Sequence, residues 1–273
     1  LAQDHAVAQE AQLHAAAVTI EGLTAISRDM NVFYIPLLVQ SFEELDFIRS
    51  NLLDDLTEDL DSQGFMILGW ADVGWAYWFS RKPILTPEDL KDLRLFSWAG
   101  DYRWVELWKK AGFHPVPLAS VDLLPSLQTG LVDAFATAPM VALSKQWFGP
   151  APHMLDLKWG PMIGAIIIST KMWESIPAAY HPLLLEIARE TEIRARDLLP
   201  LVQEALDVMN EYGLQIHRPS GDQQKAWIDL THAFYPDIRG VLVPEEVFDR
   251  AIELKREWDE RKRGTPEAPS PGN

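Results

Sequence analysis

The amino-acid sequence predicts an α/β fold with a mainly parallel sheet. Between residues 65 and 169, short apolar runs typical of buried strands alternate with segments that show helical periodicity or helix-capping residues. This strand–helix–strand order favours parallel strands joined by helical crossovers. The 273 residues, 48% hydrophobic and 23% charged, are enough for one large globular domain or two ordinary ones.

The first strong helical pattern covers residues 42–60. Ser41 is the predicted N-cap, and Glu44 three residues later is expected to complete a capping box. Gly64 is predicted to end the segment. The apolar residues that fall on one helical face are Leu45, Ile48, Leu52, Leu56 and Leu60.

The next elements are short and sharply capped. The apolar run 65–69 predicts a buried strand. Thr86 and Pro87 predict the start of a helix, with a threonine cap and proline in the first turn. We then expect a strand over 94–98, a helix over 101–111 and a strand over 114–118.

The alternation is expected to continue to residue 169. Ser120 is predicted to cap a helix that Gly130 closes. A strand over 131–137 and a helix over 139–148 follow. Two further strands are expected near 154–157 and 163–169.

The last third is predicted to be mostly helical. An apolar stripe runs over 182–212, and Pro200 is expected to kink or split that helix. A short strand over 214–216 and helices over 222–235 and 244–262 follow. Residues 265–273 contain three prolines and are predicted to be a disordered tail. The N-terminus resembles the interior of a helix that runs into a strand, not a signal peptide, so we expect a missing precursor segment or a fragment.

The charge balance and the composition exclude several classes of function. Forty acidic residues against 24 lysines and arginines give a net charge of −16, which argues against a nucleic-acid or anionic-membrane partner. The uncharged stretch 159–170 is too short to cross a bilayer. The absence of cysteine excludes disulfides, thiolate metal sites and cysteine nucleophiles.

Local motifs for catalysis, cofactors or metals are missing from the sequence. It contains no phosphate-binding glycine loop and no GxSxG elbow, and its seven histidines lack HExxH or HxxxH spacing. A calcium-like loop begins at Asp59, but its twelfth position is Trp70 instead of glutamate, so we reject it. We therefore expect no catalytic residue, no cofactor and no metal.

Tryptophan is the unusual feature of the composition. Six of the eleven tryptophans lie between residues 70 and 108. Trp104 and Trp108, four residues apart on a predicted helix, fit a core position most simply. Trp70 and Trp98 each close a predicted strand, where α/β folds bind ligands, so each is a candidate for both pocket and core. Trp147, at a helix end, is a further candidate for the same pocket.

Four short segments occur in a specific order between residues 86 and 139. They are TPEDLKDLRLF, then Gly112 followed by a strand with two prolines, then a helix ending in Leu-Gln-Thr-Gly, then a strand that begins Val132-Asp133 and is followed by Pro139. In this combination they resemble the DctP-type solute receptors of TRAP transporters. The similarity covers most of the chain, through SIPAAYHPLLLEIA and EYGLQIHRP.

The resemblance implies a periplasmic-binding-protein-like clamshell of two α/β lobes, joined by crossing strands and a long helix. It implies an N-terminally incomplete lobe 1 within residues 1–90 and lobe 2 with the crossing strands over 91–170. Residues 171–264 would carry the long helix and the C-terminal helices that pack back across the lobes. Members bind a small solute, usually an organic acid, and deliver it to membrane permease subunits. They are periplasmic or lipid-anchored, so the resemblance implies a periplasmic protein without catalytic activity.

The chain departs from the family pattern where most members carry a carboxylate-binding arginine on a strand. That place falls on Phe96, with Arg94 two residues earlier on the same face. A second arginine of some members aligns near Trp75 or Ala76. The chain is therefore similar to a divergent subgroup that lacks the usual arginine and carries a Trp-x-Gly-Asp segment, here residues 98–101.

The family's remaining site positions can be carried over residue by residue. A polar position aligns with Thr137 or Ala138, and a histidine or asparagine position falls near Trp159. The cleft implied in this way is apolar and aromatic. The expected ligand-binding residues are Trp70, Trp75, Phe96, Trp98, Asp101, Thr137, Pro139, Trp147 and Trp159.

This lining sets an expectation for the solute. Without a guanidinium, a dicarboxylate would leave a charge poorly paired in a dry cleft, at a cost of several kcal/mol. We therefore expect an apolar or amphipathic solute, or a monoacid held by another donor such as Arg103. Asp101 has two interpretations, as N-cap of the following helix or as a ligand contact. Asp133 is expected to fix the geometry of a strand start.

Two other functions remain open from the sequence. An α/β hydrolase would need a nucleophile–base pair assembled from distant residues, for instance a serine near His114 or His153. A truncated receptor that no longer binds solute would survive as an interaction scaffold. The sequence indicates neither the solute nor the oligomeric state.

Overall fold

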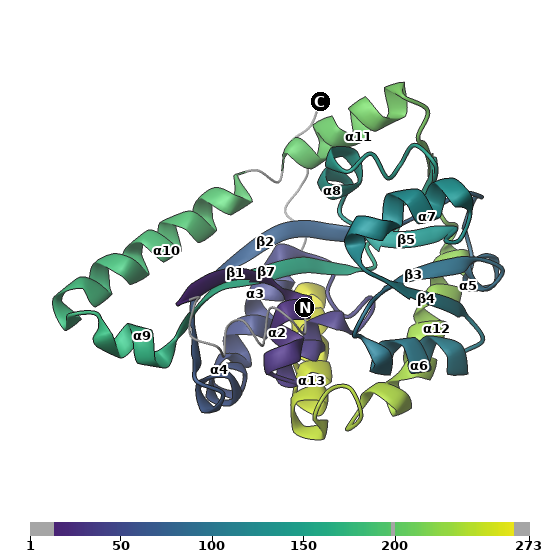
Figure 1. Cartoon of the computed structure of the whole chain (residues 1–273). Coiled ribbons are helices and arrows are strands. Elements are labelled where there is room, and N and C mark those ends of the chain that lie inside the picture. The colour runs from purple at the N-terminus through teal and green to yellow at the C-terminus, as the bar shows by residue number, and fades with distance from the viewer. Residues whose placement is uncertain (1–13, 198–199, 265–273) are drawn as a thin grey trace, which may run out of the picture.

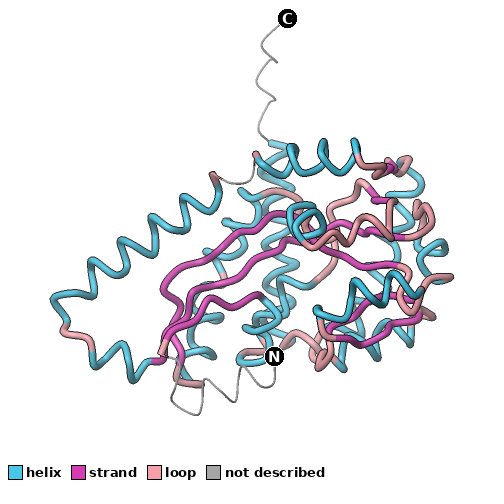
Figure 2. The backbone as a smooth tube through the Cα atoms, turned by 45° about the horizontal axis from the view of Figure 1, so that its top comes forward, coloured by secondary structure: helices cyan, strands magenta, loops and turns pink. Residues whose placement is uncertain are grey.

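The computed structural model describes residues 14–197 and 200–264. Eight strands in these residues form one open sheet, ordered β1-β7-β2-β5-β3-β4, with β6 paired to β2 and β8 paired to β6. Figure 2 shows the long strands running side by side through the middle of the molecule. The strands are β1 (Ala15–Thr19), β2 (Phe65–Ser80), β3 (Arg94–Trp98), β4 (His114–Leu118), β5 (Ala134–Thr137), β6 (His153–Leu155), β7 (Gly160–Ser169) and β8 (Gln215–His217).

The sheet is mixed, so the prediction of a mainly parallel sheet is wrong. Strand β3 is parallel to β4 and β5, and β6 is parallel to β8. The longer strands β2 and β7 are antiparallel to each other, and β1 and β5 pair antiparallel with them. Buried strands read as continuous apolar runs, which do not reveal the direction of their partners.

Strand β2 connects the two ends of the sheet. Its residues 65–76 pair with β7, and its last four residues pair with β5. The register shifts between Asp72 and Gly74, where Gly74 adopts a φ of +129°, a conformation that favours glycine. The predicted strand over 65–69 is only the beginning of this 16-residue strand. Trp70 therefore lies inside a strand, and the prediction that it closes one is wrong.

Helices cover both sides of the sheet, and the long helix α10 runs along β2 at one end of the molecule (Figure 1). The α-helices are α2 (Ile20–Ile26), α3 (Phe42–Asn51), α4 (Leu53–Ser62), α5 (Pro87–Lys91), α6 (Tyr102–Lys110), α7 (Leu123–Thr129), α8 (Pro139–Ser144), α9 (Thr170–Ser175), α10 (His181–Arg196), α11 (Leu201–Glu211), α12 (Gly221–Ile238) and α13 (Glu245–Gly264). Short 3₁₀ turns are η1 (Asp29–Tyr34), η2 (Ser120–Asp122) and η3 (Ala178–Tyr180). The predicted tail 265–273 and the first thirteen residues lie outside the described part.

Most helix boundaries follow the sequence signals. The Ser41 hydroxyl accepts a hydrogen bond from the Glu44 N–H at 3.1 Å, as predicted. The Glu44 carboxylate, however, accepts from the Gln40 N–H at 2.7 Å, so no capping box forms at Ser41. The predicted helix over 42–60 is divided at the fully buried Leu52.

Three further boundary predictions have mixed outcomes. Thr86 forms the complete capping box with Asp89 that starts α5. Pro200 separates α10 from α11, as expected. The Ser120 cap is wrong, because residue 120 opens the 3₁₀ turn η2 and α7 starts only at Leu123, without a side-chain cap.

An ionic cluster fastens α10 to β2 and α3. The Asp72 carboxylate on β2 is fully buried and lies 2.9 Å from Nη1 of Arg49 and 2.6 Å from Nη2 of Arg196. Asp46 bonds both arginines from α3. Two guanidinium groups thus satisfy one buried carboxylate, which is the condition for a buried charge to be tolerated.

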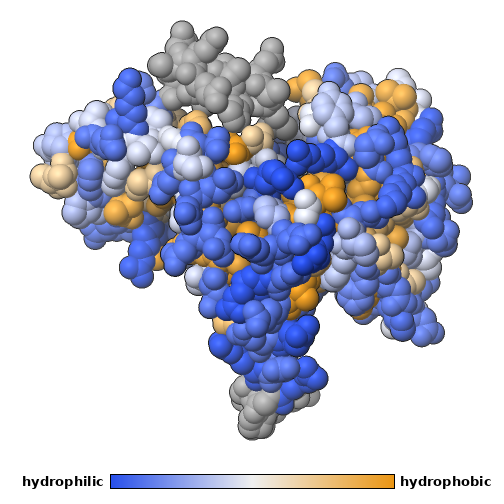
Figure 3. All heavy atoms as spheres, turned by 90° about the horizontal axis from the view of Figure 1, so that it is seen from below, coloured by the Kyte–Doolittle hydropathy of each residue, from blue (hydrophilic) through white to orange (hydrophobic). Residues whose placement is uncertain are grey.

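The outer surface is largely polar, as the net charge requires. Figure 3 shows mostly hydrophilic side chains on one face, with hydrophobic patches gathered between the hydrophilic ridges near its middle. None of the helices in residues 14–197 and 200–264 combines the length and the hydrophobicity that crossing a membrane requires.

Candidate ligand-binding cleft

An aromatic cavity of about 170 Å³ lies where the two ends of the sheet meet. Its walls come from α2 and η1 on one side, from β3, β5 and the start of α6 on the other, and from β2 and β7, which run through both. The carboxyl ends of the parallel strands β3 and β5 open into it, which is where open α/β sheets place ligands. Six of the nine expected residues line this cavity: Phe96, Trp98, Asp101, Thr137, Trp147 and Trp159.

The other three expected residues lie outside the cavity lining. Trp70 packs edge-on against Phe33, with the Arg49 guanidinium 5.0 Å from its ring centre. Trp75 packs against Phe42 at 5.3 Å. Pro139 is buried in the first turn of α8.

Strand β3 places two aromatic rings on one face. Phe96 and Trp98 are two residues apart, so both side chains point to the same side of the sheet, and their ring centres lie 5.2 Å apart. At the end of β5, the Thr137 hydroxyl lies 3.8 Å from the sulfur of Met162 on β7. These contacts form the wall on the β3–β5 side.

Three tryptophans from different elements form the floor of the cavity. The ring of Trp78 on β2 lies 6.0 Å from that of Trp108 on α6 and 5.7 Å from that of Trp159, and the latter two rings stack at 5.9 Å. The sequence predicts Trp108 as core, and it is buried, but it also lines the cavity. Helical spacing identifies the buried face of a helix without showing whether that face meets a core or a cavity.

The described lining of the cavity contains two acidic side chains, Glu21 and Asp101. The sequence did not indicate Glu21, and it left two interpretations of Asp101. Among the described residues that line the cavity, Glu21 and Asp101 carry charge and none is lysine or arginine. Burial, helped by the nearby Glu21 carboxylate, raises the pKa of Asp101 to about 7. Burial also raises the pKa of Tyr34 well above its usual value, and Glu21 adds to that effect. No sequence signal identifies Glu21, because it lies on the short helix α2 without a motif.

Asp101 sits at the N-cap position of α6, but its side chain makes no capping hydrogen bond. The backbone N–H of Trp104 only partly offsets the rise in its pKa. Asp101 lines the cavity, and the Trp104 N–H that lowers its pKa is the donor that an N-cap residue would accept, so both interpretations of Asp101 stay open.

The arginines expected near the solute lie elsewhere. Arg94, at the start of β3, binds the Asp133 carboxylate through two nitrogens at 2.7 and 3.0 Å. Arg103 is exposed on α6 and does not line the cavity. Neither guanidinium can therefore reach a solute in this cavity as it stands.

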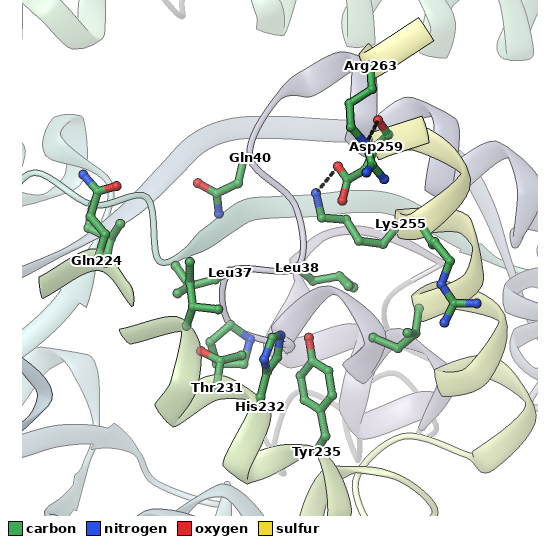
Figure 4. A pocket seen from close by; sticks show the side chains of 15 residues that line it. Leu37, Leu38, Gln40, Gln224, Thr231, His232, Tyr235, Lys255, Asp259 and Arg263 are labelled. Carbon is green, nitrogen blue, oxygen red and sulfur yellow. Dashed lines mark hydrogen bonds and ion pairs between the residues drawn. The ribbon is translucent and has the colours of Figure 1, made fainter. Parts of the chain in front are cut away.

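A second hollow, of about 570 Å³, lies between α12 and α13. Figure 4 shows Lys255, Asp259 and Arg263 along α13, with His232 and Tyr235 on α12. Lys255 Nζ bonds Asp259 at 2.8 Å, and Nε of Arg263 donates to the Asp259 carbonyl at 3.2 Å. Because two of its cations are engaged within α13, and because none of the expected residues lines it, we take the aromatic cavity as the candidate site.

Metal binding finds no support in this part of the chain. Within residues 14–197 and 200–264, no group of three or more histidine, aspartate or glutamate side chains is arranged to hold a metal ion. His153 instead contacts His217, with Nδ1 and Nε2 2.9 Å apart.

Crossing strands between two α/β ends, with an aromatic cavity where those ends meet, define a two-lobe solute-binding fold. A TRAP periplasmic solute-binding protein from Shewanella oneidensis with bound succinate shares this fold, with a TM-score of 0.84 over 93% of this chain and 83% of that chain at 17% identity. Residues 5–239 match the family described as bacterial extracellular solute-binding protein, family 7 (DctP). The chain belongs to this family.

Curated relatives are distant in sequence. The C4-dicarboxylate-binding periplasmic protein DctP of Rhodobacter capsulatus is 22% identical over 206 residues, which cover 74% of this chain and 62% of that protein. The 2,3-diketo-L-gulonate-binding periplasmic protein YiaO of Escherichia coli is 24% identical over 197 residues, which cover 70% of this chain and 59% of that protein. The chain thus spans about 60% of the length of the curated relatives that it matches.

Proposed function

We propose that the chain is the periplasmic solute receptor of a TRAP-type transporter. It captures a small organic solute in the aromatic cavity between its lobes and delivers the solute to membrane permease subunits. Its family and the printed names of its relatives as periplasmic binding proteins support this function and this location. In this proposal the chain has no catalytic activity of its own.

The observation that carries the proposal is the convergence of distant aromatic side chains on one cavity. Phe96, Trp108 and Trp159 come from a strand, a helix and a loop, yet their rings line the same space. Core packing alone would fill such a space with side chains. A cavity with aromatic walls and few polar groups is typical of a site for a small organic molecule.

In this proposal the first lobe lies within residues 1–90, and residues 91–170 form the second lobe with the crossing strands. Strands β2 and β7 link the two ends, and the irregular pairing at Gly74 lies between them. Closure about these strands would bring Glu21 and Tyr34 toward Asp101, which is the hinge motion of two-lobe binding proteins.

The hydrolase alternative has no specific observation in its favour. It requires a serine beside His114 or His153, and the described partner of the His153 ring is His217. The truncated-scaffold alternative is decided by the binding experiment below.

Intrinsic tryptophan fluorescence and thermal melting, measured against a panel of carboxylates, amines and neutral apolar solutes, test the receptor function. A solute that binds the folded state raises its free energy of unfolding by RT ln(1 + [L]/Kd), about 2.7 kcal/mol at 100 times Kd. We expect at least one saturable response. Trp98→Ala should weaken the response at least tenfold, because Trp98 lines the cavity.

The matched control is Trp258→Ala on α13, whose ring packs against Phe47 away from the cavity. It should bind as the wild type does. The receptor proposal is contradicted by a folded protein that responds to no solute in the panel, or by a response that Trp258→Ala abolishes and Trp98→Ala leaves unchanged.

A further inference from the structure

We propose that the solute is a small organic cation, an alkylated ammonium group that also carries an oxygen acceptor. This inference rests on the proposed receptor function and names the class of solute that its cleft takes. It departs from the organic acids bound by the relatives named above, and it follows from three features of the cavity: its charges, its aromatic walls and an indole N–H without a partner among the described residues.

The charges of the lining are of one sign. Glu21 on α2 and Asp101 before α6 are its charged side chains among the described residues. Neither forms an ion pair with another described residue, whereas Asp72, Asp46 and Asp133 are all held by arginines. Two carboxylates that share a partly buried site repel each other, and a cation placed between them removes that repulsion.

No lysine or arginine among the described residues lines the cavity. Arg94 binds Asp133, and Arg196 binds Asp46 and Asp72. Lys158 donates to the Gln40 carbonyl at 2.9 Å and lies 4.9 Å from the Trp75 ring centre, outside the lining. A cationic solute would supply the positive charge that Glu21 and Asp101 lack in this lining.

The aromatic walls suit a cation as well as an apolar group. The faces of tryptophan and tyrosine rings carry negative potential and bind alkylated ammonium groups, by about 2 kcal/mol or more when water is excluded. The rings that line the cavity beside the two carboxylates are Tyr34, Trp78, Trp98, Trp104, Trp108 and Trp159.

An unpaired donor indicates the second feature of the solute. The side chain of Trp78 is 4% exposed, it lines the cavity, and its Nε1–H has no hydrogen-bond partner among the described residues. A buried donor without an acceptor costs about 1–3 kcal/mol. A neutral oxygen on the solute, such as a hydroxyl group, would accept this bond without adding a negative charge beside Glu21 and Asp101.

Isothermal titration with three probes tests the inference. Choline has the proposed chemistry, 3,3-dimethylbutan-1-ol has the same shape without the charge, and succinate is a dianion. We expect choline to bind saturably, its neutral isostere to bind at least tenfold more weakly, and succinate not to bind. Asp101→Asn and Glu21→Gln should each weaken choline binding at least tenfold, and Glu190→Gln, an exposed acid on α10, should leave it unchanged.

The outcomes separate the two proposals. If succinate binds and choline does not, or if the isostere binds as tightly as choline, the cation inference is wrong while the receptor function stands. If none of the three probes binds but a carboxylate or a neutral solute from the wider panel does, the cation inference is again wrong. A folded protein that binds nothing overturns both. Circular dichroism confirms that each variant is folded, and Glu21→Gln carries the test if Asp101→Asn does not fold.

Discussion

Nε of Arg94 lies 2.7 Å from Oδ2 of Asp133, and Nη2 of Arg94 lies 3.0 Å from Oδ1 of Asp133. The Asp133 N–H in turn donates to the Arg94 carbonyl at 2.8 Å. The arginine nearest in sequence to the expected ligand position therefore joins the start of β3 to the segment before β5. This pairing leaves the cleft without the guanidinium that a solute carboxylate would need.

Asp133→Asn should lower the free energy of unfolding at pH 7 by about 1 kcal/mol, because the ion pair is half exposed. Partial burial alone would raise the pKa of Asp133, but hydrogen bonds from Arg94 outweigh it and the net pKa is lowered. The stabilisation is thus present above the unfolded pKa of about 3.9 and is lost as the pH falls through the folded pKa. Urea denaturation at pH 7 and at pH 3 measures the effect. If the variant and the wild type differ in their free energy of unfolding by the same amount at pH 7 and at pH 3, this account is wrong.

Asp72→Ala should be strongly destabilising. It removes one of the two aspartates that bond the buried Arg49, whose side chain is 5% exposed, and one of the two that bond Arg196. Removing one side of a buried pair costs about 3–5 kcal/mol. The control Glu190→Gln breaks the exposed pair with Arg194 on α10 and should cost less than about 1 kcal/mol. If chemical denaturation shows that both variants lose similar free energy of unfolding, the ionic cluster around Asp72 has no special role in stability.

Asp101→Asn should stabilise the free protein at high pH. The folded pKa of Asp101 is about 7, against about 3.9 when unfolded. The folded state therefore holds more protons between these values, so the wild type loses stability as the pH rises from about 4 to 7. The charged and titratable groups that face Asp101 are Glu21 and Tyr34.

Thermal melting without solute checks this expectation. The Asp101→Asn melting temperature should exceed that of the wild type by at least about 2 °C at pH 8 and equal it at pH 4. Asp61→Asn, at an exposed position of α4, is the control and should show no such dependence on pH. An Asp101→Asn variant less stable than the wild type at pH 8 would mean that the carboxylate has a structural partner.

Gly164→Ala should disturb the pairing of β1 with β7. A Cβ atom at residue 164 would lie 2.4 Å from the Val18 carbonyl oxygen, so the two strands must separate. Overpacking of this kind costs about 1–3 kcal/mol. Gly160→Ala, four residues earlier on β7, meets nothing within 4 Å and serves as the control. Equal stability of the two variants in urea would show that β1 moves without cost.

Helix boundaries were the most predictable part of the fold. The threonine cap at Thr86, the glycine Gly130 that closes α7 and the break at Pro200 are all present. Each depends on contacts within about four residues, so the sequence contains the whole cause. The prediction at Ser120 failed although its pattern is similar, because a 3₁₀ turn competes with the α-helix at the same residues.

The sheet was less predictable than the helices. The apolar run 65–69 predicted a short strand, yet β2 continues to residue 80 because β7 pairs with it across the molecule. The direction of the partner strand and a pairing between residues more than eighty positions apart leave no local signal. The extent of β2 and the mixed character of the sheet therefore depended on tertiary contacts.

The sequence by itself determined that this chain is an α/β protein with an unusual wealth of tryptophan, and its resemblance to the family predicts that Phe96 stands in the place of the usual arginine. Tertiary structure decided which tryptophans meet, placing Trp78, Trp108 and Trp159 around one cavity and Trp70 and Trp75 outside it. It also placed Glu21 near Asp101 and engaged Arg94 with Asp133. The physical reason is that residue type sets what a side chain can bind, whereas long-range packing sets which side chains share a space and which charges are left without a partner.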